Sequence, residues 1–276
     1  MISKRLIFNQ TLQSVLMALF LIGGLAWTAT AVEGASLHGW NAIMQATLTT
    51  PGLVIPVAPL ICAIGSGFAA ARSMASGERE GWMAAGHSPT KIGVAAMVLG
   101  FCFGAAQLLA HETVVPWAES ARTQSGALHS WVWLEDEPIR VSDGLRMEII
   151  DGNVTGNHVF TPLSDQELRD ALQQLNPSGS PIKSLNRTPA SQLEFHRRLA
   201  RIIACAAWAW LAWLPWGTAR PVQHIGRVLA AALTWFAMDL VFFGLSSQGH
   251  ASTAVGGWGA TGVLMALLAW SASKSR

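Results

Sequence analysis

The sequence predicts an α-helical polytopic membrane protein, with three transmembrane helices on either side of a small β-rich domain. Hydrophobic residues make up 51% of the 276 residues and charged residues only 12%, whereas a soluble globular chain has about 25% charged residues. The charged residues are nearly absent from six segments. Most of the polar remainder lies in one block, residues 117–198. Together these observations predict six transmembrane helices in a 3+3 arrangement.

Each of the six apolar segments is close to the ~20 residues that a helix needs to cross about 30 Å of hydrocarbon. Because backbone groups in lipid must be hydrogen-bonded within the segment, each segment is expected to be helical. The segments are residues 11–32, 51–71, 92–110, 199–216, 228–246 and 256–272. They predict a first transmembrane half (1–116), an external domain (117–198) and a second transmembrane half (199–276).

The first segment has an alternative interpretation as a secretory signal peptide, because the small-residue stretch AWTATAVEGA follows it. Its apolar run is longer than a usual signal core and further apolar segments follow, so we expect a retained helix.

The orientation follows from the basic residues near the short loops. The loops 32–40 and 246–253 contain no Lys or Arg. With a cytoplasmic N-terminus, the basic residues on that side are Lys4, Arg5, Arg72, Arg79, Lys91, Arg220, Arg227, Lys274 and Arg276. The pattern predicts that both termini are cytoplasmic and that the polar block lies outside.

The polar block contains three segments with strand-like composition, residues 130–135, 145–150 and 153–160, separated by turn signals. A helix is expected over residues 163–175, where Ser164 and Glu167 form a capping pattern. The block is therefore predicted to be β-rich with one helix.

The cytoplasmic loop 72–91 is expected to contain a short helix over residues 78–85. Glu78 and Glu80 suit the positive end of its dipole, and Gly86 suits its C-terminal stop. One interpretation is an amphipathic connector that lies on lipid. The other is a coupling helix, by which a transport ATPase grips its membrane subunit.

Two stretches carry a family resemblance. The first combines Glu78 with AAGHS (84–88). The second is LEFHRRLARIIACAAWAWLAWLPWGTARPVQHIGR (193–227), with weaker matches at HETVVPWAESAR (111–122) and LSDQEL (163–168). The residues that carry the second match are Glu194, His196, Arg198, Leu199, Leu214, Pro215, Gly226 and Arg227. With these features the chain resembles the lipopolysaccharide-export permease family, the LptF and LptG subunits of an ABC transporter.

The resemblance implies a permease subunit in the bacterial inner membrane that extracts lipopolysaccharide for transport to the outer membrane. The implied partners are a cytoplasmic ABC ATPase, a second related permease, the lipid, and a periplasmic bridge component. The implied ATPase-coupling residues are Glu78, Arg79, Glu80, Trp82, Met83, Gly86, His87 and Ser88. Residues 11–32 and 228–246 would form lateral gates.

The family's periplasmic domain is a β-jellyroll that hands lipid to the bridge. Residues 117–198 are fewer than that domain needs, so a truncated jellyroll-like domain is expected, and the handover to a bridge stays open. Two alternatives remain for the whole chain. It could be a permease of the same fold for another amphipathic lipid, or a non-transporting membrane scaffold or regulatory subunit.

Several polar residues near or inside the apolar segments are candidates for function. Asp239 lies well inside one of them, where a charge is costly unless it is paired. No basic residue is apparent at matching depth, so its partner is expected in another subunit; a structural hydrogen bond or a neutral acid are the alternatives. His196, Arg197, Arg198 and Arg201 either anchor the interface by snorkelling or contact lipid phosphate.

Other motifs are absent or structural. The sequence contains no GxxxxGK[ST], HExxH or GxSxG motif, so no enzymatic activity and no cofactor are expected. It has neither zinc-ligand spacing nor a basic stripe for nucleic acid. Small-residue patterns at GFCFG (100–104) and GGWGATG (256–262) allow close helix contacts and are weak indicators of dimerisation.

Overall fold

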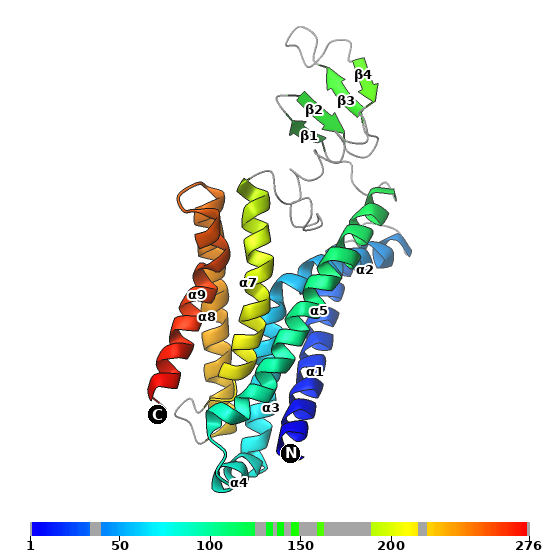
Figure 1. Ribbon diagram of the computed structural model, residues 1–276. Coiled ribbons are helices and arrows are strands. Elements are labelled where there is room, and N and C mark those ends of the chain that lie inside the picture. The colour runs from blue at the N-terminus through cyan, green and yellow to red at the C-terminus, as the bar shows by residue number, and fades with distance from the viewer. Residues whose placement is uncertain are drawn as a thin grey trace.

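The computed structural model describes residues 2–33, 40–124, 131–134, 137–140, 145–148, 159–162, 189–214 and 220–274. Long helices form a bundle, with the start of α1, the short helix α4 and the end of α9 at one end (Figure 1). The helices are α1 (Ile2–Glu33), α2 (Trp40–Val54), α3 (Ala58–Ala75), α4 (Glu78–Ala84), α5 (Pro89–Gln124), α7 (Pro189–Leu211), α8 (Pro221–Ser247) and α9 (Thr253–Lys274).

Four helical segments of the described chain are long and apolar enough to cross a membrane. They are Arg5–Val32, Ile43–Ala75, Lys91–Ala118 and Pro221–Ser247. Large apolar side chains are widely exposed on these segments; Phe20, for example, is 80% exposed and Leu109 is 67% exposed. Exposed apolar surface of this extent is costly in water. The chain therefore has the features of a multi-pass membrane protein.

The predicted number of six transmembrane helices is not confirmed by the described residues. Four described segments, rather than six, meet the length and composition of a span. The expected span 199–216 falls in α7, which ends at Leu211 and has a strongly charged first half. The expected span 256–272 falls in α9, whose apolar part, Thr253–Ala269, is short.

The β-rich, jellyroll-like domain of the prediction is also not found in the described residues. These residues are nearly all helical, and their strands are four segments of four residues each: β1 (Trp131–Leu134), β2 (Glu137–Arg140), β3 (Leu145–Glu148) and β4 (Val159–Pro162). They pair antiparallel in the order β1-β2-β3-β4 (Figure 1). One such small meander lacks the second sheet that a jellyroll needs. The predicted helix 163–175 lies outside the described residues.

The connection between α2 and α3 contains a structural break that positions part of the site. A 3₁₀ turn, Ile55–Val57, joins the two helices. Because Pro59 has no backbone N–H, the Ile55 carbonyl cannot accept an ordinary i→i+4 hydrogen bond. It accepts instead from the backbone N–H of Ala58 and from the side-chain amide of Gln107 on α5. The break thus ties the start of α3 to α5.

Helix α7 lies at the centre of the packing and contacts α3, α5 and α9. Its contact with α5 depends on two glycines of the GFCFG pattern. A β-carbon at Gly100 would lie 2.5 Å from the carbonyl oxygen of Cys205, and one at Gly104 would lie 2.8 Å from Cα of Ile202. The small-residue spacing therefore forms a close contact between two helices of this chain.

Candidate functional site

The short helix expected in the cytoplasmic loop is present as α4, between α3 and α5. It begins after Gly77, whose φ of 73° is left-handed, and ends with Gly86 at φ 83°. The amides of Gly86 and His87 donate to the carbonyls of Met83 and Trp82, at 3.0 Å in each case. This pair of bonds is a Schellman motif, which requires the left-handed conformation that glycine adopts without strain.

One face of α4 is joined to the bundle. The Gln10 side-chain amide of α1 donates to a carboxylate oxygen of Glu78 at 2.8 Å. Trp82 packs against Trp213, just after α7, with ring centroids 6.2 Å apart. Arg79 is 3% exposed, and this burial lowers the pKa of its guanidinium, against a smaller opposing effect of Glu80. The helix is therefore connected directly to α1 and to the end of α7.

The other face of α4 is open. Glu80 is exposed and Met83 is 39% exposed. The exposed residues alternate with the buried ones at the spacing of an amphipathic helix. Beyond the helix, His87 is exposed and Ser88 is half-buried; the Ser88 hydroxyl accepts from the Lys91 backbone N–H at 3.4 Å. The predicted coupling residues thus divide between those that contact the bundle, such as Arg79 and Trp82, and those that are exposed, such as Glu80 and Met83.

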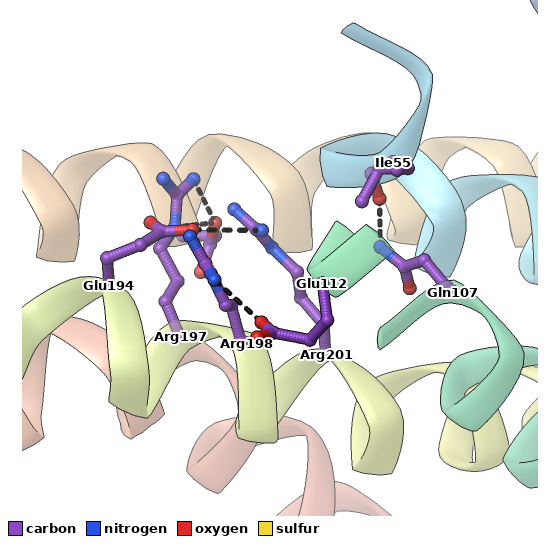
Figure 2. A network of polar contacts seen from close by, with 8 residues as sticks. Ile55, Gln107, Glu112, Glu194, Arg197, Arg198 and Arg201 are labelled. Atoms are coloured by element: carbon purple, nitrogen blue, oxygen red, sulfur yellow. Dashed lines mark hydrogen bonds and ion pairs between the residues drawn. The ribbon is translucent and has the colours of Figure 1, made fainter. Parts of the chain in front are cut away.

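A second group of polar residues lies between α5, α7 and α8 (Figure 2). Arg198 contacts Glu112 of α5 at 2.9 Å and Glu194 of its own helix at 3.2 Å. Arg201 lies 3.6 Å from the same Glu194 carboxylate oxygen. The side chains of Arg198, Glu194 and Arg201 are 1%, 5% and 7% exposed. Because these charges are removed from solvent, they depend on one another for compensation.

Asp239 has its partner within the chain. Its carboxylate accepts from Nη2 and Nε of Arg197 at 2.8 and 3.2 Å, and the Arg197 guanidinium also lies over the Phe243 ring, 4.4 Å from the centroid. The expectation of a partner in another subunit is wrong. Helix α7 begins at Pro189, ten residues before the predicted span (189 against 199), so Arg197 lies well inside the helix and reaches α8.

The described ion pairs join three basic and three acidic groups, so the cluster is balanced in charge. The set comprises Arg197, Arg198, Arg201, Glu112, Glu194 and Asp239. His196, the fourth residue of the predicted headgroup set, accepts a hydrogen bond at Nδ1 from the Trp258 indole of α9 at 3.3 Å. The structure thus brings these residues together with carboxylate and indole partners, inside a contact between four helices.

The sequence analysis missed three residues that connect helices near the two sites: Gln10 and Trp213, which contact α4, and Gln107, which contacts the carbonyl of Ile55. Each acts through a partner distant in the sequence, and neither glutamine lies in a recognisable motif. The described residues contain no group of three or more His, Cys, Asp or Glu side chains placed to hold a metal ion.

The pair Arg197–Asp239 gives a direct prediction. In the isolated chain, Asp239→Asn and Arg197→Gln are each expected to destabilise the fold. The double variant should lose less stability than the sum of the two single losses, and the difference, the coupling energy of the pair, should be about 1–3 kcal/mol. The measurement is a double-mutant cycle of thermal stability in detergent. Additive effects in the isolated chain would contradict an intrachain pair.

No known protein-family model matches the chain, and no curated protein matches it. The geometry of α4 and of the ion-pair cluster, together with the sequence resemblance, is the basis for a functional proposal.

Proposed function

We propose that this chain is the transmembrane permease subunit of an ABC-type lipid exporter, driven by a separate ATPase and paired with a second, related permease. Its cargo would be lipopolysaccharide or a related amphipathic lipid, extracted from the bacterial inner membrane. In this proposal α4 and both termini are cytoplasmic and the strands are periplasmic. The motifs around Glu78 and within residues 193–227 support the assignment, because they resemble those of the export permeases.

The two-faced geometry of α4 is the observation that carries the proposal. A coupling element needs an exposed face for the ATPase and rigid connections to the helices that it moves. Met83 and Glu80 supply the exposed face. The Gln10–Glu78 hydrogen bond and the Trp82–Trp213 contact connect α4 to α1 and to the end of α7. A displacement of α4 would therefore act on two long helices at once.

The exposed apolar side chain of Met83 provides the test of this role. Met83→Asp places a charge where the ATPase would bury an apolar group, so we expect association with the ATPase to fall about tenfold or more. The measurement is ATPase co-purification and ATP hydrolysis in the reconstituted complex.

The control is Gln248→Asp, which adds the same charge at an exposed position just after α8, at the other end of the bundle (Figure 1). It should leave both readouts unchanged. Equal behaviour of the two variants, with the folded state retained, would remove α4 from the proposed interface.

The partners and the cargo can be identified together. The tagged chain, purified in mild detergent from its native membrane, would be analysed by mass spectrometry for bound proteins and lipids. An ATPase, a second permease and lipopolysaccharide together would support the exporter in full. An ATPase together with a different lipid would support the exporter mechanism with that lipid as its cargo. A folded preparation with neither ATPase nor lipid would favour the scaffold or regulatory alternative.

A further inference from the structure

A cavity of about 890 Å³ lies between α1 and α5, at the end of the bundle that carries α4. Two basic side chains, Arg5 and Lys91, and the imidazole of His87 contribute to its lining, and none of its lining residues is acidic. All three are exposed, and the described residues offer no carboxylate partner to Arg5 or Lys91. One part of the cavity is thus positively charged, and no described carboxylate compensates this charge.

Apart from Asn9, the remainder of the lining is apolar, and on both helices the apolar residues follow the basic one. On α1, Phe8 comes three residues after Arg5; on α5, Val94 and Val98 come three and seven residues after Lys91. Residues at these spacings share one face of a helix. At 1.5 Å per residue, the apolar face of α5 continues for roughly 10 Å beyond Lys91, and that of α1 for roughly 5 Å beyond Arg5. Phe8, Val94 and Val98 are 36%, 45% and 51% exposed.

A cavity with two cationic side chains at one end and an apolar lining beyond them matches one chemical class of ligand, an anionic amphiphile. In a membrane, the molecule with an anionic phosphate at the surface and acyl chains directed inward is an acidic phospholipid. Lys and Arg bind phosphate readily, and each basic residue near an anionic leaflet contributes measurably to binding.

We propose that this cavity binds an anionic phospholipid of the leaflet on the α4 side, with its phosphate at Arg5 and Lys91 and an acyl chain along the Phe8–Val98 surface. This proposal does not depend on the exporter assignment. Because Trp82 and His87 also line the cavity, the lipid would contact α4 and the helix that follows it.

The experiment titrates the full chain in detergent with phosphatidylglycerol or phosphatidylcholine and counts bound lipids by native mass spectrometry. The wild-type chain should retain phosphatidylglycerol preferentially. The double variant Arg5→Gln/Lys91→Gln should lower that retention about tenfold or more. The control, Arg72→Gln/Arg220→Gln, removes the same charge from exposed arginines outside the cavity and should retain the lipid.

A second pair of variants tests the acyl-chain part without changing charge. Val98→Trp fills the apolar part of the cavity and should lower phosphatidylglycerol retention, whereas Met97→Trp, at a neighbouring exposed position outside the lining, should not. Equal retention of the two lipids by the wild type, or equal behaviour of the cavity and control variants, would overturn the proposal. Displacement of phosphatidylglycerol by millimolar inorganic phosphate would also overturn it, because the site would then recognise free phosphate alone.

Discussion

Replacement of Arg198 by methionine is expected to destabilise the fold by about 3–5 kcal/mol, the typical cost of leaving buried charge uncompensated. The Arg198 side chain is 1% exposed and lies between Glu112 and Glu194, so its loss leaves both carboxylates with less positive charge nearby. The measurement is the midpoint of thermal unfolding in detergent, or the yield of monodisperse protein if the variant does not fold.

A compensating variant distinguishes lost charge from lost packing. Arg198→Met/Glu112→Gln removes the pair that joins α7 to α5 and leaves Glu194 with Arg201 at 3.6 Å. It should be more stable than Arg198→Met alone, because neutralising both partners removes the unpaired charge. The exposed Arg72 provides the control, since its change to methionine should have little effect. If the double variant were no more stable than the single one, the ion pair would not be the cause.

Gly100→Val is expected to have the second large effect, a loss of about 2–3 kcal/mol or more. Its β-carbon would meet the Cys205 carbonyl oxygen at 2.5 Å and the Ala209 β-carbon at 2.7 Å, so α5 and α7 would have to separate. Gly262→Val is the matched control, because a β-carbon at Gly262 meets nothing within 4 Å. Comparable unfolding temperatures for the two variants would show that the α5–α7 contact is not close in the native protein.

The local features of this chain could be predicted from its sequence. Helix α4 could be located because Glu78 and Gly86 mark its two ends within a polar loop. Four of the six apolar segments coincide with the long apolar helices α1, α3, α5 and α8. Such elements depend on composition and on neighbours within a few residues, which is the range over which sequence patterns carry information.

The errors came from contacts between distant residues. The span within α7 was expected to begin at residue 199, just after Arg197 and Arg198, because a charged segment is unfavourable in lipid. The structure extends the helix back to Pro189, and its charges are compensated by Glu112 and Asp239 on other helices. The Ile43–Ala75 segment was expected to be helical only from residue 51, yet α2 already begins at Trp40 and contains Pro51. Neither arrangement could be inferred from local periodicity.

The ion pairs of α7 can form only in a fixed order while the chain is being synthesised. Glu112 is translated before Arg198, so this arginine can find its α5 partner as soon as α7 is made. Arg197 must wait for Asp239, which is 42 residues further along the chain. Until α8 has been synthesised, α7 carries an excess positive charge that nothing in the completed part of the described cluster neutralises. The nascent protein therefore has a defined interval in which its central helix is incompletely stabilised, and that interval ends with the insertion of α8.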